Sequence, residues 1–116
     1  MSIKRIDAGP RMSQAVVYNG IAYLSGQVAQ AAPGKSVAEQ TSAILARIDE
    51  LLAQAGTDKL KLLSANIWLT DISTFAEMNG VWDAWVSPGN APARATVESK
   101  LAAPQFTVEI AVTAAI

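Results

Sequence analysis

The sequence predicts an α+β fold in which two helices cover one face of a single mixed β-sheet. Three observations lead to this prediction. Two segments have apolar residues at helical spacing, several others are short and strand-like, and an Asn-Gly pair joins two of the strand-like segments. With 116 residues the chain has the usual length of one domain, and we expect a single domain over 1–116.

The first half of the chain is expected to supply three strands and one helix. Residues 2–6 form a short edge strand. The segments AVVY and IAYLSG form a hairpin around Asn19-Gly20, because Asn-Gly accepts the positive φ angles of a type I′ turn. After the loop AQAAPGKS, a helix over 37–55 starts with a capping box, Ser36 and Glu39, and stops at Gly56.

The second half is expected to add a long strand over 59–70, a helix over 73–86, and two final strands over 92–100 and 105–114. Thr74 and Glu77 match a second capping box at the start of the second helix. The predicted order is strand-strand-strand-helix-strand-helix-strand-strand.

One face of this sheet is left uncovered when both helices pack on the other. Side chains alternate along a strand, and Trp68 falls on the face opposite to Leu63, Ala65, Ile67 and Leu69. A tryptophan on an uncovered face indicates a contact with another subunit.

The last two strands carry an arginine and a glutamate, Arg94 and Glu109. We expect these strands to pair as an antiparallel hairpin in which Arg94 faces Ala111 and Thr96 faces Glu109. Arg94 and Glu109 are then diagonal neighbours on one face. Two interpretations remain open. The pair is either a solvated ion pair worth about 0–1 kcal/mol, or a site where Arg94 binds a carboxylate and Glu109 handles water or a proton.

Composition removes several classes of chemistry. The chain has no cysteine and no histidine, which excludes disulfides, thiol nucleophiles and imidazole bases; we expect no metal site and no cofactor. Its formal net charge of −1, without a basic run, predicts no nucleic-acid partner. No apolar run approaches the roughly 18 residues of a membrane span, and the N-terminus lacks the apolar core of a signal peptide. We therefore expect a cytoplasmic protein without a membrane partner.

Several short motifs together resemble the YjgF/RidA family of reactive-intermediate (enamine/imine) deaminases. They are Ser25-Gly26-Gln27, Leu69-Thr70-Asp71 followed by Phe75 and Met78-Asn79, Pro92-Ala93-Arg94 with Val97-Glu98, and Glu109-Ile110. The resemblance covers nearly the whole chain and includes the separation of 109 − 94 = 15 between the arginine and the glutamate. It implies a chorismate-mutase-like fold, a homotrimer, and active sites in clefts between subunits.

The resemblance also implies roles for individual residues in a deaminase of the 2-iminobutanoate/2-iminopropanoate type. Arg94 would bind the carboxylate of a 2-imino or 2-enamino acid, and Glu109 would hold the attacking water. Thr96 would contribute its backbone amide, and Ser25, Gly26 and Asn79 would complete the substrate-binding set. The implied reaction releases a 2-oxo acid and ammonia and needs no cofactor.

Two positions depart from the family pattern. Met12, at a substrate-binding position, stands where many members carry a tyrosine, which suggests a different substrate preference. Thr96 stands where many carry a cysteine. A second interpretation of the same residues is a trimer that binds or senses a small carboxylate without turning it over, because Arg94 would serve there equally well. A ribonuclease function fits poorly with the acidic balance and the absence of histidine.

Overall fold

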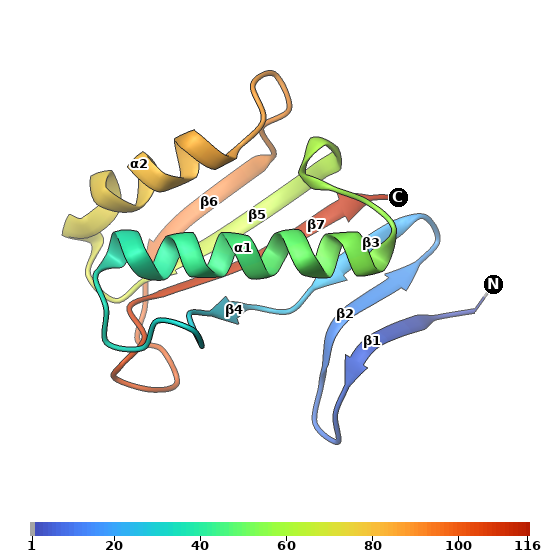
Figure 1. Ribbon diagram of the computed structural model, residues 1–116, viewed down its shortest axis with the longest axis horizontal. Helices are drawn as coiled ribbons and strands as arrows, with labels where there is room; N and C mark the ends of the chain where they lie inside the picture. Colours follow the sequence, from blue (N-terminus) through green and yellow to red (C-terminus); the bar gives the residue numbers. More distant parts are fainter. Residues whose placement is uncertain (1) are drawn as a thin grey trace.

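The computed structural model describes residues 2–116 and consists of one mixed sheet with two helices (Figure 1). The sheet has the strand order β1-β2-β3-β7-β5-β6, and a short β4 also pairs with β7. The predicted order of strands and helices is confirmed, with β4 as an addition. The elements are β1 Lys4–Ala8, β2 Ser13–Tyr18, β3 Ile21–Leu24, β4 Gln27–Val28, α1 Val37–Ala55, β5 Leu62–Leu69, α2 Phe75–Trp85, β6 Ala93–Glu98 and β7 Val108–Ala115.

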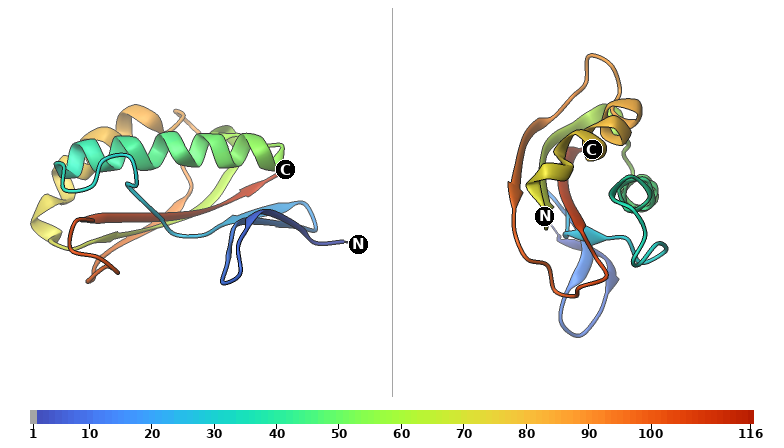
Figure 2. Two further views of the ribbon diagram at one scale, coloured as in Figure 1. Left: turned by 60° about the horizontal axis from the view of Figure 1, so that its bottom comes forward. Right: turned by 90° about the vertical axis from the view of Figure 1, so that its left-hand side faces the viewer.

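Figure 2 shows α1 and α2 on the same side of the sheet, as predicted. The core lies between this side of the sheet and the helices. Burial of each large aliphatic side chain there contributes about 1.5–3 kcal/mol. The fully buried large aliphatic members from α1, β5 and β7 are Ile44, Leu45, Ile48, Leu51, Leu52, Ile67, Leu69, Val108, Ile110 and Val112.

Local signals in the first half of the chain are confirmed, except for one half of the predicted capping box. Asn19 and Gly20 have φ angles of 52° and 78°, as a type I′ turn requires. The Ser36 hydroxyl accepts a hydrogen bond from the Glu39 amide at the start of α1, as the capping box predicts. The Glu39 carboxylate accepts from the Ser36 hydroxyl and not from the Ser36 amide, so the reciprocal half of the box is wrong. Gly56 has a φ of 86° after the last turn, and its amide donates to the carbonyl of Ala53.

The second capping box is wrong. Thr74 makes no capping hydrogen bond with its side chain, and its hydroxyl donates instead to the Asp71 carbonyl. The Glu77 carboxylate accepts a hydrogen bond of 2.9 Å from the amide of Ala38 in the first turn of α1. Glu77 therefore satisfies an amide of the other helix, which a local sequence pattern cannot indicate.

The final hairpin is also wrong, because β5 lies between β6 and β7 (Figure 1). β6 pairs in parallel with β5, and β7 pairs with the other side of β5 in antiparallel orientation. The parallel pairing of β5 and β6 follows from the segment that connects them. This segment includes α2, which is long enough to return the chain from the end of β5 to the level where β5 starts. Arg94 is consequently paired with Ala65, and Glu109 with Trp68, in place of the expected diagonal contact.

The sheet face away from the helices is uncovered in the chain. Trp68 lies on this face, as predicted, beside Val97 and Glu109. Val97 is 50% exposed and Tyr23 46% exposed on the same face, so the surface is partly apolar. The predicted face of Leu63 is wrong, because an irregularity between Leu62 and Ser64 shifts the alternation and leaves Leu63 exposed. In residues 2–116, no helix is both long and apolar enough to cross a membrane.

Candidate functional site

Arg94 lies on β6 on the side covered by α2, and two kinds of contact fix its guanidinium. Nη1 donates a hydrogen bond of 2.8 Å to the side-chain oxygen of Asn79. The guanidinium carbon lies 5.8 Å from the ring centre of Phe75 and 5.3 Å from that of Trp82, within range of cation–π attraction. Within residues 2–116 this is its one hydrogen bond, so the remaining N–H groups can bind a planar oxyanion such as a carboxylate.

Thr96 follows Arg94 on the same face of β6 and pairs with buried Ile67. Its hydroxyl is buried and has no hydrogen-bond partner in the described chain. β6 is an edge strand, so alternate backbone amides along it have no strand partner. These features place an arginine and unpaired edge amides close together beneath α2.

Glu109 lies on β7, paired with Val28 on one side and Trp68 on the other. Its carboxylate rests directly over Gly26. A Cβ atom at Gly26 would lie 2.9 Å from Glu109 Cδ and closer still to Oε2, so any other residue at position 26 would displace the carboxylate. Glycine at position 26 therefore leaves the space in which the Glu109 carboxylate lies.

A cleft of about 610 Å³ lies beside Glu109 and Gly26. Its mouth includes Met12, which is 47% exposed, at the predicted substrate-binding position. Small side chains on α1 and in the loops keep the cleft open. Its lining comprises Met12, Gln14, Gly26, Gln27, Val28, Gln30, Ala31, Ala43, Ala46, Arg47, Glu50, Ala102 and Glu109.

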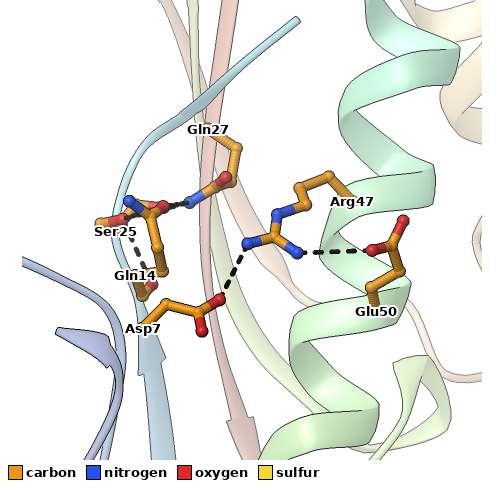
Figure 3. Close-up of polar contacts among 6 residues, drawn as sticks. All are labelled: Asp7, Gln14, Ser25, Gln27, Arg47 and Glu50. Carbon is orange, nitrogen blue, oxygen red and sulfur yellow. Dashed lines mark hydrogen bonds and ion pairs between the residues drawn. The ribbon is translucent and has the colours of Figure 1, made fainter. Parts of the chain in front are cut away.

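A polar network next to this cleft was not predicted from the sequence (Figure 3). Gln27 Nε2 lies within hydrogen-bond distance of Gln14 Oε1, Ser25 O and Ser25 Oγ, at 3.0, 3.2 and 3.1 Å. Nearby, Arg47 forms ion pairs with Asp7 at 3.1 Å and Glu50 at 3.3 Å. The one sequence signal for the network is Gln27 in the Ser-Gly-Gln motif; its burial, at 6% exposure, appears only in the folded chain.

The predicted site residues fall into two groups, and the charged residue of each group, Arg94 or Glu109, leaves the sheet on the opposite face from the other. The arginine group comprises Arg94, Thr96 and Asn79, on the helix side, where the strand partner of Arg94 is buried Ala65. The glutamate group comprises Glu109, Gly26, Ser25 and Met12, and the strand partner of Glu109 is Trp68 on the uncovered face. Side chains from opposite faces of one sheet diverge, so a single chain does not bring the two groups together.

One carboxyl outside both groups, Asp71, has its pKa lowered because the side chain and the backbone amide of Ser73 donate hydrogen bonds to it. Among residues 2–116, no three Asp or Glu side chains gather closely enough to hold a metal ion.

Comparisons with known proteins agree on one group of relatives. Residues 2–116 match the family model described as endoribonuclease L-PSP. The chain is 46% identical over 114 residues to a RutC family protein of Haemophilus ducreyi, covering 98% of this chain and 97% of that one. A solved YjgF-family structure from Neisseria meningitidis matches with a TM-score of 0.95 and 50% identity, covering 99% of this chain and 95% of that one. A Rid-family protein from Yersinia pestis matches with a TM-score of 0.88 and 31% identity, covering 99% and 100%.

Proposed function

Because the chain belongs to the endoribonuclease L-PSP family, whose relatives are also named YjgF, RutC and Rid, we propose that it hydrolyses reactive 2-imino and 2-enamino acids. The products are 2-oxo acids and ammonia. The active sites lie between subunits of a homotrimer, and each site takes the arginine group of one subunit and the glutamate group of its neighbour.

The observation that carries this proposal is the placement of Arg94 and Glu109 on opposite faces of the sheet. A substrate held by Arg94 can meet a glutamate of this kind only if a second subunit supplies it. A contact that joins one face of a subunit to the opposite face of the next is head-to-tail, and such contacts form a ring when the rotation between subunits closes, as it does in a trimer. The partly apolar uncovered face, with Tyr23, Trp68 and Val97, gives the neighbour a surface to pack against.

In the proposed reaction Arg94 and unpaired amides of β6 bind the substrate carboxylate, which orients the adjacent imine carbon. Glu109 of the neighbouring subunit accepts a hydrogen bond from a water molecule and directs it to that carbon. The water oxygen forms a bond to carbon as the C=N double bond becomes single, and a proton of that water passes by way of Glu109 to the nitrogen. The carbinolamine then transfers its hydroxyl proton to the nitrogen as the C–N bond breaks, which forms the C=O group of the 2-oxo acid and releases ammonia. An enamine first takes a proton on carbon to become the imine.

The imine is already electrophilic, so positioning supplies much of the acceleration that the reaction needs. Asn79 and the rings of Phe75 and Trp82 hold the Arg94 guanidinium in place before substrate binds. Less side-chain entropy is therefore lost when the substrate binds. Met12 at the mouth of the cleft stands where many family members carry a tyrosine. It offers the substrate a flexible apolar contact in place of a hydroxyl, which favours substrates with apolar side chains.

The test is competition with a chemical trap. An amino-acid oxidase generates imines from a panel of amino acids, and semicarbazide captures whatever the protein does not hydrolyse first. We expect the wild-type protein to suppress trapping, and Arg94→Ala and Glu109→Gln to lose that effect. If the wild type never competes with the trap yet binds 2-oxo acids, the protein is a carboxylate-binding or sensing trimer. RNA binding with a steep salt dependence would instead favour a ribonuclease.

A further inference from the structure

The segment between β3 and β4 interrupts the sheet at the point where Glu109 is supported. β3 ends at Leu24 and β4 begins at Gln27, so Ser25 and Gly26 belong to neither strand. Gly26 nevertheless has to stay within contact of the Glu109 carboxylate, which occupies the space of a missing side chain. Something other than the strand ladder must hold these two residues in place.

One backbone hydrogen bond to β2 and several side-chain hydrogen bonds hold this segment. Ser25 is engaged through each of its polar groups: its amide donates to Gln14 O at 2.9 Å, its hydroxyl donates to the same carbonyl at 3.2 Å, and its carbonyl accepts from Gln27 Nε2 at 3.2 Å. The hydroxyl also accepts from Gln27 Nε2 at 3.1 Å. Figure 3 shows Gln14, Ser25 and Gln27 turned toward one another.

Gln27 is suited to hold a fixed position because its side chain is buried, at 6% exposure. A buried amide that lost these contacts would leave polar atoms unsatisfied, so the network strongly favours one arrangement. The Gln27 side-chain amide also donates to Gln14 Oε1 at 3.0 Å, and this bond links the segment to β2. The Ser25–Gly26 segment is therefore fastened to β2 on one side and to the start of β4 on the other.

We propose that Ser25, Gln14 and Gln27 are positioning residues that set Gly26 and, through it, the Glu109 carboxylate, and that the Ser25 hydroxyl does not bind substrate. This inference rests on the proposed hydrolysis, in which Glu109 directs the water. It assigns Ser25 a role different from the one expected for it as a substrate-binding residue, and it gives Gln14 and Gln27 a role that no motif indicated.

The test separates positioning from substrate contact by matched variants. Ser25→Thr keeps the hydroxyl, and Ser25→Val has the same shape without it. We expect Ser25→Val and Gln27→Met each to lower kcat about fivefold to tenfold, with KM and the affinity for a 2-oxo acid such as pyruvate unchanged. Ser25→Thr should retain activity, and Ser42→Ala, at an exposed serine of α1, serves as the control.

Two further measurements keep the inference falsifiable. The double variant Ser25→Val/Gln27→Met should be little worse than either single variant, because both remove the same support. Exchange of the amide hydrogen at position 25, which donates to Gln14 O, should rise about fivefold or more in Ser25→Val and Gln27→Met and not in Ser42→Ala. A raised KM with unchanged kcat in Ser25→Val would mean that the hydroxyl contacts substrate, and would overturn the inference.

Failure of the proposed function has a different signature. If the wild-type protein does not compete with the trap, hydrolysis is refuted whatever the variants do. Hydrogen exchange of the amide at position 25 then decides alone: a rise in Ser25→Val and Gln27→Met supports the positioning role, and no change in either variant refutes it.

Discussion

Mixed trimers give the sharpest test of a site shared between subunits. The perturbation is a pair of complementary losses, Arg94→Ala on one chain and Glu109→Gln on another. Each variant alone removes one half of every site, so we expect each homotrimer to lose about a hundredfold or more in kcat/KM. A trimer that contains both kinds of chain can still assemble an intact site, because Arg94 and Glu109 leave the sheet on opposite faces.

The size of the recovery follows from counting neighbours. A ring of three that contains both chains has one contact, and no more, where an intact Arg94 meets an intact Glu109. Every mixed trimer therefore has one working site in three, and its activity should be about one third of the wild-type value. A two-subunit ring of the same kind would instead recover about one half, so the measured fraction also reports the number of subunits.

The assay uses two affinity tags. The variants are produced together, each with its own tag, and purification over both tags isolates mixed assemblies only. Suppression of semicarbazide trapping is then compared with wild-type protein that carries the same two tags. Doubly tagged assemblies built from one variant alone should stay inactive. If mixed assemblies are no more active than these controls, the site is not shared in the way that the geometry indicates.

Three other changes test single features. Gly26→Ala should lower kcat at least about tenfold, because its Cβ would displace the Glu109 carboxylate, while 2-oxo acid binding, measured by calorimetry, persists. Asn79→Leu should raise KM about fivefold to tenfold through loss of the 2.8 Å bond that orients Arg94; a change in kcat alone would contradict this. Asp71 has a pKa below its ordinary 3.8, so its ionised form stabilises the fold above pH 3.8, and this contribution is lost as the pH falls through the lower folded value. Urea unfolding should show Asp71→Asn to be less stable than wild type at pH 7, with the difference shrinking below pH 3.8; a constant difference would contradict it.

Structural features that depend on residues close together in the chain could be predicted from the sequence. The bounds of α1, its cap at Ser36 and the turn at Asn19-Gly20 depend on local backbone geometry, and the structure has them as predicted. The residues proposed to bind the substrate carboxylate and to direct the water, Arg94 and Glu109, could also be selected as candidates. Their types and their place in strands carry that information without any partner.

Only the tertiary structure decided which strands are neighbours. Alternation along a strand fixes which residues share a face within it, but it leaves the partner strand open. β5 lies between β6 and β7 in the sheet. Because of this strand order, Arg94 lies on the face that the helices cover and Glu109 lies on the uncovered face. The network of Gln14, Ser25 and Gln27 has the same origin, since it joins residues 11 to 13 positions apart that meet only once the sheet has formed.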